Sequence, residues 1–250
     1  MIVKTQISLK SWKADAAMNI KINYTAFLVN DWEMIVEKHL FHMCKSGLYS
    51  NCNTFNIFAY PKTDKLIRLV EKYKMAQKTH IYFFDENMYE FPAIEDLINN
   101  PDDINLYFHT KGVSLKGSPM SYVPSLMWND YMTYFNISHW IDNIKLLHGN
   151  VCSGVEFGKT SDNPAKYLYA GNFWWATREH LNLVKMCPRY TEFHEHKNRY
   201  LCETIIEGAP GDFYELYNSC TDTPKSGFLY FNPFVGYRFS VSNIKKYEIK

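Results

Sequence analysis

The sequence predicts an α/β fold in which helices flank a mostly parallel central sheet. Short apolar runs alternate with amphipathic helical patterns over the first 110 residues, and turn residues separate them. With 250 residues, 46% of them hydrophobic, the chain is long enough to bury a sizeable core. No internal repeat divides the chain. We therefore expect a single domain, 1–250, with a core of about 20–210 and a C-terminal extension, 211–250, packed on it.

The elements of the first half alternate regularly. Strands are expected at 24–29, 55–60, 81–84 and 104–108, where the residues are mainly apolar. A helix follows a capping box at 30–33 and ends at Ser46-Gly47, and further helices are expected at 63–74 and 92–98. Strand–helix–strand units of this kind favour parallel pairing.

The second half is less regular. A Gly/Ser/Pro-bearing loop at 113–123 is long enough to cover a ligand. A long helix is expected from Pro124 to about 147, strands at 151–157 and 167–173, and helices at 177–186 and 199–207. Beyond residue 210 the pattern weakens, and 227–239 alternates like a strand.

Composition excludes several classes of protein. The 27 basic and 26 acidic residues nearly cancel, so no nucleic-acid partner is expected. The six cysteines show no Cys-x-x-Cys spacing, which favours free thiols in a reducing compartment over a zinc site. Lysines interrupt the N-terminus and no run reaches about 20 apolar residues, so neither a signal peptide nor a transmembrane segment is expected. We expect a cytoplasmic protein (in the host cytoplasm if the chain is viral). Peripheral membrane attachment and the oligomeric state stay open.

The segment His109-Thr110-Lys111-Gly112 is the first candidate site. It directly follows the expected strand 104–108, and ligands of open α/β sheets bind beyond the carboxyl ends of strands. Lys111 is a point charge that can pair with a phosphate, Gly112 permits a positive φ, and His109 can hydrogen-bond or coordinate a metal. A solvent-exposed turn with an ordinary structural histidine would have the same sequence pattern.

The segment Gly171-Asn172-Phe173-Trp174-Trp175 is the second candidate. Adjacent tryptophans on a strand point to opposite faces, so one is expected in the core, preferably Trp175. Trp174 could then form an apolar wall for a sugar ring or a base. Asn172 has the donors and acceptors to bind hydroxyl groups. Both tryptophans would be core residues on the alternative interpretation.

Three acidic positions complete the candidates. Glu90 precedes an expected helix, where the helix dipole alone would explain it. Glu203 lies four residues after Arg199, so the two could form a helical ion pair or present a carboxylate to a cleft. Asp85, which follows the third strand, is the nearest approach to an acidic metal-binding string.

Taken together, these strings resemble a group of glycosyltransferase-like proteins from bacterial polysaccharide gene clusters and large DNA viruses. The resemblance covers about 24–207 and rests on the segment 107–114, Trp128 and Met132, the segment 171–176, and Arg199-Tyr-x-x-Glu203. It implies a GT-A-like, Rossmann-like fold, a UDP-, GDP- or TDP-sugar donor, and a glycan or glycoconjugate acceptor. The Asp-x-Asp that holds a divalent cation in GT-A enzymes is replaced here by His109-Thr-Lys111, which leaves open whether Mn²⁺ or Mg²⁺ is needed.

The resemblance also implies roles for individual residues. Lys111 and His109 are expected to neutralise the diphosphate, and Glu203 to act as the base if the reaction inverts. A cation, if present, is expected at His109 or Asp85. Donor or acceptor contacts are expected from Glu90, Thr110, Gly112, Trp128, Gly171, Asn172, Trp174 and Arg199. Two other functions stay open: a sugar nucleotidyltransferase, although no Gly-rich phosphate loop follows the first strand, and a non-catalytic protein that binds carbohydrate or nucleotide sugar.

Overall fold

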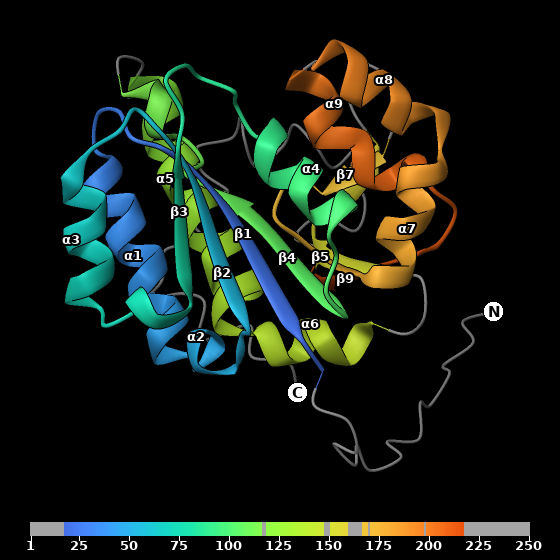
Figure 1. Cartoon of the computed structure of the whole chain (residues 1–250), viewed down its shortest axis with the longest axis horizontal. Helices are drawn as coiled ribbons and strands as arrows, with labels where there is room; N and C mark the ends of the chain where they lie inside the picture. The colour runs from blue at the N-terminus through green and yellow to red at the C-terminus, as the bar shows by residue number, and fades with distance from the viewer. Residues whose placement is uncertain are drawn as a thin grey trace.

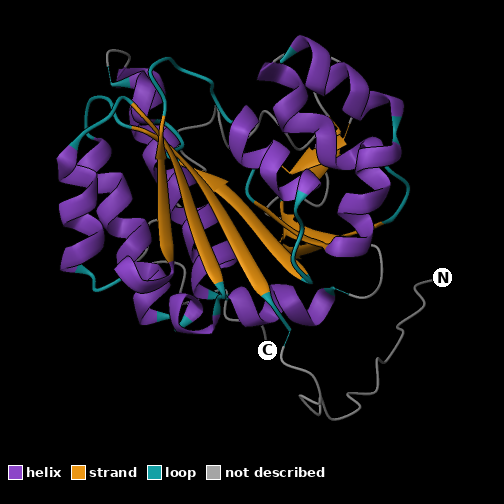
Figure 2. Cartoon of the chain, viewed as in Figure 1, coloured by secondary structure: helices purple, strands orange, loops and turns teal. Residues whose placement is uncertain are grey.

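A seven-stranded sheet forms the centre of the computed structural model, which describes residues 18–116, 119–147, 151–159, 167–169, 171–197 and 199–217. Helices cover both faces of this sheet (Figures 1 and 2). The strands lie in the order β3 (Thr79–Phe83), β2 (Thr54–Tyr60), β1 (Ile20–Phe27), β4 (Ile104–His109), β8 (Trp174–Thr177), β5 (Val151–Val155) and β9 (Asp212–Tyr217). A separate two-stranded sheet joins β6 (Phe157–Lys159) and β7 (Tyr167–Tyr169).

Pairing in the large sheet is mostly parallel. Strand β1 lies between β2 and β4 and runs parallel to both, and β3 continues the parallel set beyond β2. Strand β8 is antiparallel to both of its neighbours, β4 and β5, whereas β5 and β9 are parallel. The predicted α/β fold, with a Rossmann-like, mostly parallel sheet flanked by helices, is confirmed.

The helices form two layers. One layer includes α1 (Trp32–Lys45) and α3 (Asp64–Lys72), and the other includes α4 (Phe91–Asn99) and α7 (Arg178–Met186), on the opposite side of the strands in Figure 1. The remaining helical segments are α2 (Leu48–Asn51), η1 (Ala76–Lys78), η2 (Val113–Leu115), α5 (Pro119–Met132), the π-helix η3 (Thr133–Ser138), α6 (Trp140–Leu146), α8 (Pro188–His196), α9 (Arg199–Thr204) and η4 (Ile205–Gly208). Among the described helices, none has the length and apolar character that crossing a membrane requires.

Side-chain alternation divides the core between the two faces of the sheet. In β4, Leu106 and Phe108 join the cluster under α1, while Tyr107 joins the cluster under α4 and α7. Strand β8 repeats this division, with Trp175 in the first cluster and Trp174 in the second. A strand that is buried on both faces carries a continuous apolar run, which is why β4 was visible in the sequence.

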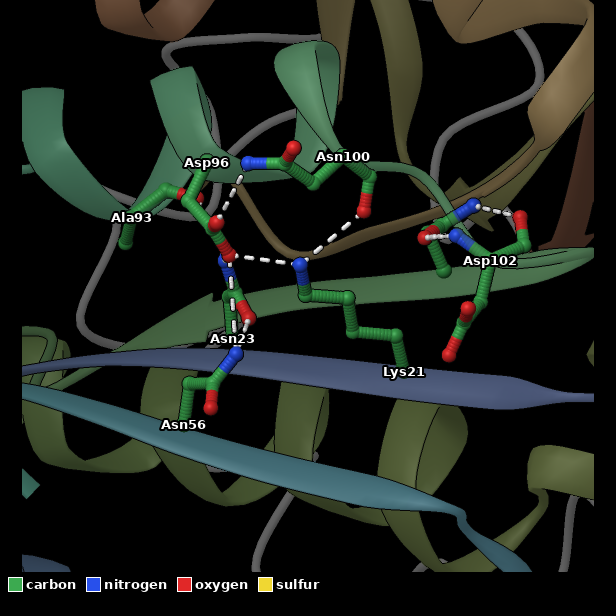
Figure 3. A network of polar contacts seen from close by, with 8 residues as sticks. Lys21, Asn23, Asn56, Ala93, Asp96, Asn100 and Asp102 are labelled. Carbon is green, nitrogen blue, oxygen red and sulfur yellow. Dashed lines mark hydrogen bonds and ion pairs between the residues drawn. The ribbon is translucent and has the colours of Figure 1, made fainter. Parts of the chain in front are cut away.

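Polar side chains fix helix α4 to the sheet (Figure 3). Lys21 and Asn23 of β1 reach the Asp96 carboxylate at 2.7 and 2.8 Å, and Asn23 also donates to the Ala93 carbonyl at 2.8 Å. Asn56 of β2 donates to the Asn23 side chain at 3.0 Å. These contacts are mostly buried, and each satisfies a polar group that burial would otherwise penalise. They hold α4 in place, and therefore also Glu90, the residue that precedes it.

Several predicted elements differ from the structure. The capping box at 30–33 is not formed, because Asp31 at the start of α1 makes no side-chain cap hydrogen bond. The expected helix 124–147 is three segments, α5, η3 and α6. The expected strand 167–173 ends at Tyr169 and gives way to a turn, after which β8 begins at Trp174. Helix α8 was not predicted at all.

The C-terminal part of the described chain belongs to the sheet. Strand β9 lies within the segment expected as an extension, and it pairs with β5 along its length. The expected strand at 227–239 lies outside the described residues. Cys44, Cys52, Cys152, Cys187 and Cys202 are free thiols, as the spacing predicted.

Candidate active site

A cleft of about 320 Å³ opens at the carboxyl ends of β1, β2 and β4. This is the edge of the sheet at which ligands of α/β proteins bind. The cleft combines a lysine, a histidine and two glutamates with aromatic rings and backbone. Its lining residues are Thr25, Ala26, Phe27, Phe58, Ala59, Tyr60, Phe84, Asn87, Met88, Tyr89, Glu90, His109, Thr110, Lys111, Gly112, Val113, Ser114, Leu115 and Glu203. Six predicted site residues therefore lie together: Glu90, His109, Thr110, Lys111, Gly112 and Glu203.

The turn after β4 is shaped by hydrogen bonds to β1. The Thr110 hydroxyl accepts from the Phe27 backbone N–H at 2.9 Å, and the Thr110 N–H donates to the Thr25 carbonyl at 3.0 Å. Gly112 has φ +86°, and a Cβ there would lie 2.7 Å from the Ser125 Cβ. Glycine is therefore required at this position, and the turn presents Lys111 at the cleft wall.

His109 is held between two acceptors. Its Nε2 lies 2.9 Å from the Gly171 carbonyl, and its Nδ1 lies 3.4 Å from Oε1 of Glu90. The His109 and Glu90 side chains are only 12% and 14% exposed. Burial lowers the pKa of His109 below its ordinary value, against the opposing effect of the Glu90 carboxylate. Because both ring nitrogens face protein oxygens, this geometry does not support the predicted direct contact of His109 with a diphosphate.

Asn172 fixes the other oxygen of Glu90. Its side-chain amide donates to Glu90 Oε2 and to the Cys202 carbonyl, the latter at 3.2 Å, and its Oδ1 accepts from the Trp174 indole at 2.9 Å. Asn172 is only 3% exposed. All of the hydrogen bonds described for its side chain are therefore made to other groups of the protein. The prediction that Asn172 binds substrate hydroxyls is not supported, because its donors and its acceptor are already engaged.

Gly171 and Trp128 form the support behind His109. Gly171 has φ +87°, and a Cβ there would lie 2.2 Å from the Met132 Sδ and 2.4 Å from the Trp128 Nε1. Trp128 is 5% exposed and is not among the lining residues of the cleft. Its indole nitrogen has no hydrogen-bond partner within the part of the chain that the structure describes. The expected substrate contact of Trp128 is therefore replaced by packing against the turn.

Both tryptophans of β8 are core residues. Trp174 is 1% exposed and Trp175 is fully buried, on opposite faces of the sheet. The Trp174 ring packs against Tyr107 with centroids 5.3 Å apart. The expected indole wall of the cleft is therefore not present at Trp174. The aromatic rings that do line the cleft belong to Phe27, Phe58, Tyr60, Phe84 and Tyr89.

Two residues of the β1–α1 loop hold the segment after Gly112. Asn30, with φ +54°, donates to the Val113 carbonyl at 2.9 Å. Asp31 pairs with Lys116 at 2.5 Å and accepts from the Tyr122 hydroxyl at 2.5 Å. These contacts lower the pKa of Asp31, and the Asp31 hydrogen bond raises the pKa of Tyr122 to about 12. The sequence pattern at 30–33 predicts a helix cap and gives no indication of these contacts between the β1–α1 loop and the segment after Gly112.

The remaining predicted residues lie apart from the cleft or cannot be placed in it. Asp85 is exposed and does not line the cleft, which removes it as a cation ligand there. Arg199 begins α9, and its side chain lies outside the described part of the chain. Within that part, no group of three or more His, Cys, Asp or Glu residues is arranged to hold a metal ion.

The comparisons with known proteins give structural similarity without sequence similarity. No protein-family model matches the chain, and no curated protein matches its sequence.

Similar solved structures include the 4-diphosphocytidyl-2C-methyl-D-erythritol synthase from Anaerococcus prevotii, at 9% identity and TM-score 0.47, covering 93% of this chain and 100% of that one. HddC from Yersinia pseudotuberculosis matches at 8% identity and TM-score 0.47, over 91% and 99% of the two chains. A CMP:2-keto-3-deoxy-manno-octonic acid synthetase complexed with CTP matches at 10% identity and TM-score 0.42, over 90% and 99%. At this level, the similarity identifies neither the residues that bind here nor the reaction.

Proposed function

We propose that the chain is a glycosyltransferase that moves a sugar from a nucleotide-sugar donor to a glycan or glycoconjugate acceptor. One observation carries the proposal: a single cleft at the carboxyl ends of β1, β2 and β4 combines Lys111, Glu90 and Glu203 with aromatic rings. A nucleotide sugar requires these three kinds of contact: a cation for its diphosphate, acceptors for its hydroxyls, and flat apolar surface for its base.

Lys111 is the residue assigned to the diphosphate. It lies on the turn after β4, beside the positive-φ residue Gly112, where backbone and side chain can both approach an anion. As the bond to the sugar breaks, negative charge grows on the departing phosphate oxygen. A positioned lysine stabilises that charge more in the transition state than in the ground state.

The aromatic part of the cleft is assigned to the base. Phe27 and Tyr60 stack with ring centroids 6.0 Å apart, and Phe58 and Phe84 stack at 6.4 Å. All four rings line the cleft, on the β1, β2 and β3 side of Lys111. Aromatic side chains of this kind bury flat ligand surface at little conformational cost.

The reaction would be a displacement at the anomeric carbon. The acceptor hydroxyl oxygen attacks that carbon, the carbon–oxygen bond to the diphosphate breaks, and the nucleoside diphosphate leaves. The hydroxyl proton passes to a carboxylate, for which we assign Glu203 in an inverting reaction, since it lies in the cleft on α9. The anomeric configuration of the product distinguishes this route from a retaining one.

The β1–α1 loop argues against the nucleotidyltransferase alternative. That alternative needs a glycine-rich loop after the first strand to surround a triphosphate. Residues 28–31 contain no glycine, and Asn30 and Asp31 are engaged with the segment after Gly112. The non-catalytic alternative makes no prediction about this loop and differs only in turnover.

A single panel of assays tests the proposal. UDP-, GDP- and TDP-sugars are screened by thermal shift, and a donor at about 100 times its Kd should stabilise the chain by about 2.7 kcal/mol. Transfer of the sugar from that donor to an acceptor glycan, or to water, is then measured by the nucleoside diphosphate that is released. Pyrophosphate released from a nucleoside triphosphate plus a sugar 1-phosphate would instead favour the nucleotidyltransferase, and binding without any turnover would favour the binding protein. If no donor raises the melting temperature, the proposal fails.

A further inference from the structure

Tyr89 has an unusual backbone conformation for a bulky residue. Its φ is +52°, in the left-handed region that residues with large side chains rarely adopt. Its backbone N–H donates to the Asn87 side-chain oxygen at 2.9 Å, which holds the turn in this shape. Strained residues persist only where the surrounding structure holds them, and they cluster at sites that bind ligands. The strain makes Tyr89 a candidate for a role in binding.

The loop that carries Tyr89 is anchored at both ends. Phe84, which directly follows β3, donates its N–H to the β2 backbone at 3.1 Å. At the other end, the Glu90 carboxylate is held by the turn before β8, and Phe91 is buried against Phe193 with ring centroids 4.6 Å apart. The Tyr89 ring is therefore presented by a fixed loop, which lowers the entropy that a ligand loses on binding to it.

Tyr89 is the most exposed of the aromatic residues that line the cleft. It is 49% exposed, whereas Phe58 is buried and the other three, Phe27, Tyr60 and Phe84, are partly buried. Its ring therefore lies at the rim of the cleft and offers an apolar surface together with a polar hydroxyl group.

Two polar side chains of the same loop line the cleft together with Tyr89. Asn87 carries an NH₂ group that can donate hydrogen bonds, and the Glu90 carboxylate can accept them. A sugar ring has C–H groups on its faces and hydroxyl groups around its edge. An aromatic ring flanked by a donor and an acceptor matches that distribution of apolar and polar groups.

We propose that Tyr89, with Asn87 and Glu90, forms a subsite for a sugar ring of the acceptor glycan. The rim position favours the acceptor, because a glycan chain must extend out of the cleft into solvent. The diphosphate and the base of the donor are assigned to Lys111 and to the less exposed rings. The choice of acceptor over donor rests on the proposed function.

The test measures saccharide binding without any turnover. The full chain is mixed with a panel of methyl glycosides and disaccharides, in the presence and absence of UDP, GDP or TDP, and binding is followed by NMR of the saccharide. The natural protein should bind at least one saccharide and shift C–H protons on one face of its ring upfield, as an aromatic face does. Tyr89→Asn should weaken this binding about fivefold or more and abolish the shift.

The choice of variants separates the ring from the turn. Asn tolerates a positive φ, so Tyr89→Asn should fold with a Tm within about 2 °C of that of the natural protein. Tyr89→Phe keeps the ring and should bind the saccharide nearly as well as the natural protein. Tyr214→Asn is the matched control, because Tyr214 is 37% exposed on β9 and is not among the lining residues of the cleft. It should leave saccharide binding unchanged.

Three results would overturn the inference. The natural protein could bind no saccharide of the panel, or Tyr89→Asn could bind with the natural affinity. The loss could also be confined to nucleotide sugars, seen as a change in their Kd relative to that of the free nucleoside diphosphate, and Tyr89 would then contact the donor instead. In each case, thermal shift of the natural protein with nucleotide sugars still tests the proposed function, so the two failures are distinguishable.

Discussion

The side-chain amide of Asn172 donates to the carboxylate of Glu90, although 82 residues separate them in the chain. Asn172 lies in the turn before β8, with φ +57°, and Glu90 lies directly before α4. The contact joins the start of α4 to the turn before β8. It gives the Glu90 carboxylate one orientation, with Oε2 bound and Oε1 facing His109.

Replacement of Asn172 by Asp should destabilise the chain. Asp tolerates the left-handed backbone as Asn does, so the change acts through the side chain. It removes the donors to Glu90 and to the Cys202 carbonyl, and it places a second carboxylate against Glu90 in a buried site. We expect a loss of roughly 2–3 kcal/mol in the free energy of unfolding, measured with urea.

Asn51→Asp is the control for that variant. The Asn51 amide also donates to a backbone carbonyl, that of Gly47 at 2.8 Å, but on an exposed helix. The control should stay within about 0.5 kcal/mol of the natural protein. Equal effects of the two substitutions would contradict the role assigned to Asn172.

The sequence predicts most of the first half of the fold. Strands β1, β2, β3 and β4 are short apolar runs bounded by turn residues, and they lie within a few residues of the predicted positions. The second half is harder to predict because sequence patterns report local structure, whereas strand pairing there depends on contacts between distant segments. The pattern of 171–177 cannot reveal that two positive-φ residues precede β8, nor that β8 runs antiparallel to β4. The apolar periodicity from Pro124 onward continues through the π-helix η3, so the break there is invisible.

The candidate site shows the same limit. His109, Lys111, Glu90 and Glu203 were selected by residue type and by position at strand or helix ends, and the structure gathers them in one cleft. Asn172 and Trp174 were selected as ligand contacts but are directed at protein partners. Residue type alone does not distinguish a side chain that binds substrate from one that holds its neighbour, because both are polar groups near a cleft.

A methyl group at Gly171 should disrupt the turn behind His109. Gly171→Ala combines a left-handed backbone, at φ +87°, with contacts of 2.2 and 2.4 Å to Met132 and Trp128. Adding about 1–2 kcal/mol for the backbone to about 1–3 for the overpacking gives an expected loss of roughly 2–5 kcal/mol, measured by thermal or urea unfolding.

Gly47→Ala separates the two causes. Gly47 also has a positive φ, +77°, but the nearest atom to an added Cβ is the Asn51 Nδ2 at an ordinary 3.7 Å. This variant should show the backbone cost alone, about 1–2 kcal/mol. If Gly171→Ala proves no more costly than Gly47→Ala, the tight packing behind His109 is not real.

Acid should destabilise the chain through His39. This side chain is fully buried, with the Tyr24 hydroxyl 3.0 Å from Nδ1 and Asn129 Oδ1 3.2 Å from Nε2. Burial lowers the pKa of His39 well below the ordinary value. Below about pH 6.5, His39 therefore becomes protonated in the unfolded state while it stays neutral in the native state. The free energy of unfolding should be constant near neutral pH and should decline below about pH 6.5, with a slope approaching about 1.4 kcal/mol per pH unit for this one group.

Urea unfolding at a series of pH values measures that slope. His39→Gln should show a shallower decline, although His42 and His109, whose pKa values are also lowered by burial, keep part of it. His194→Gln, at the surface, should keep the full decline. A His39→Gln variant with an unchanged slope would show that His39 does not control the acid response.

Lys111→Ala tests the residue on which the proposed chemistry depends most. Lys111 lines the cleft, and its ammonium group is the positive charge assigned to the diphosphate. Loss of a charge that acts on the departing phosphate should raise the barrier by roughly 3 kcal/mol, about a hundredfold in rate. The measurement is nucleoside diphosphate release at saturating donor, so that weaker binding is not mistaken for slower chemistry. Lys145→Ala, which removes an exposed lysine paired with Asp142 on α6, should leave the rate unchanged. An equal rate for Lys111→Ala and Lys145→Ala would remove Lys111 from the mechanism and with it the assigned place of the diphosphate.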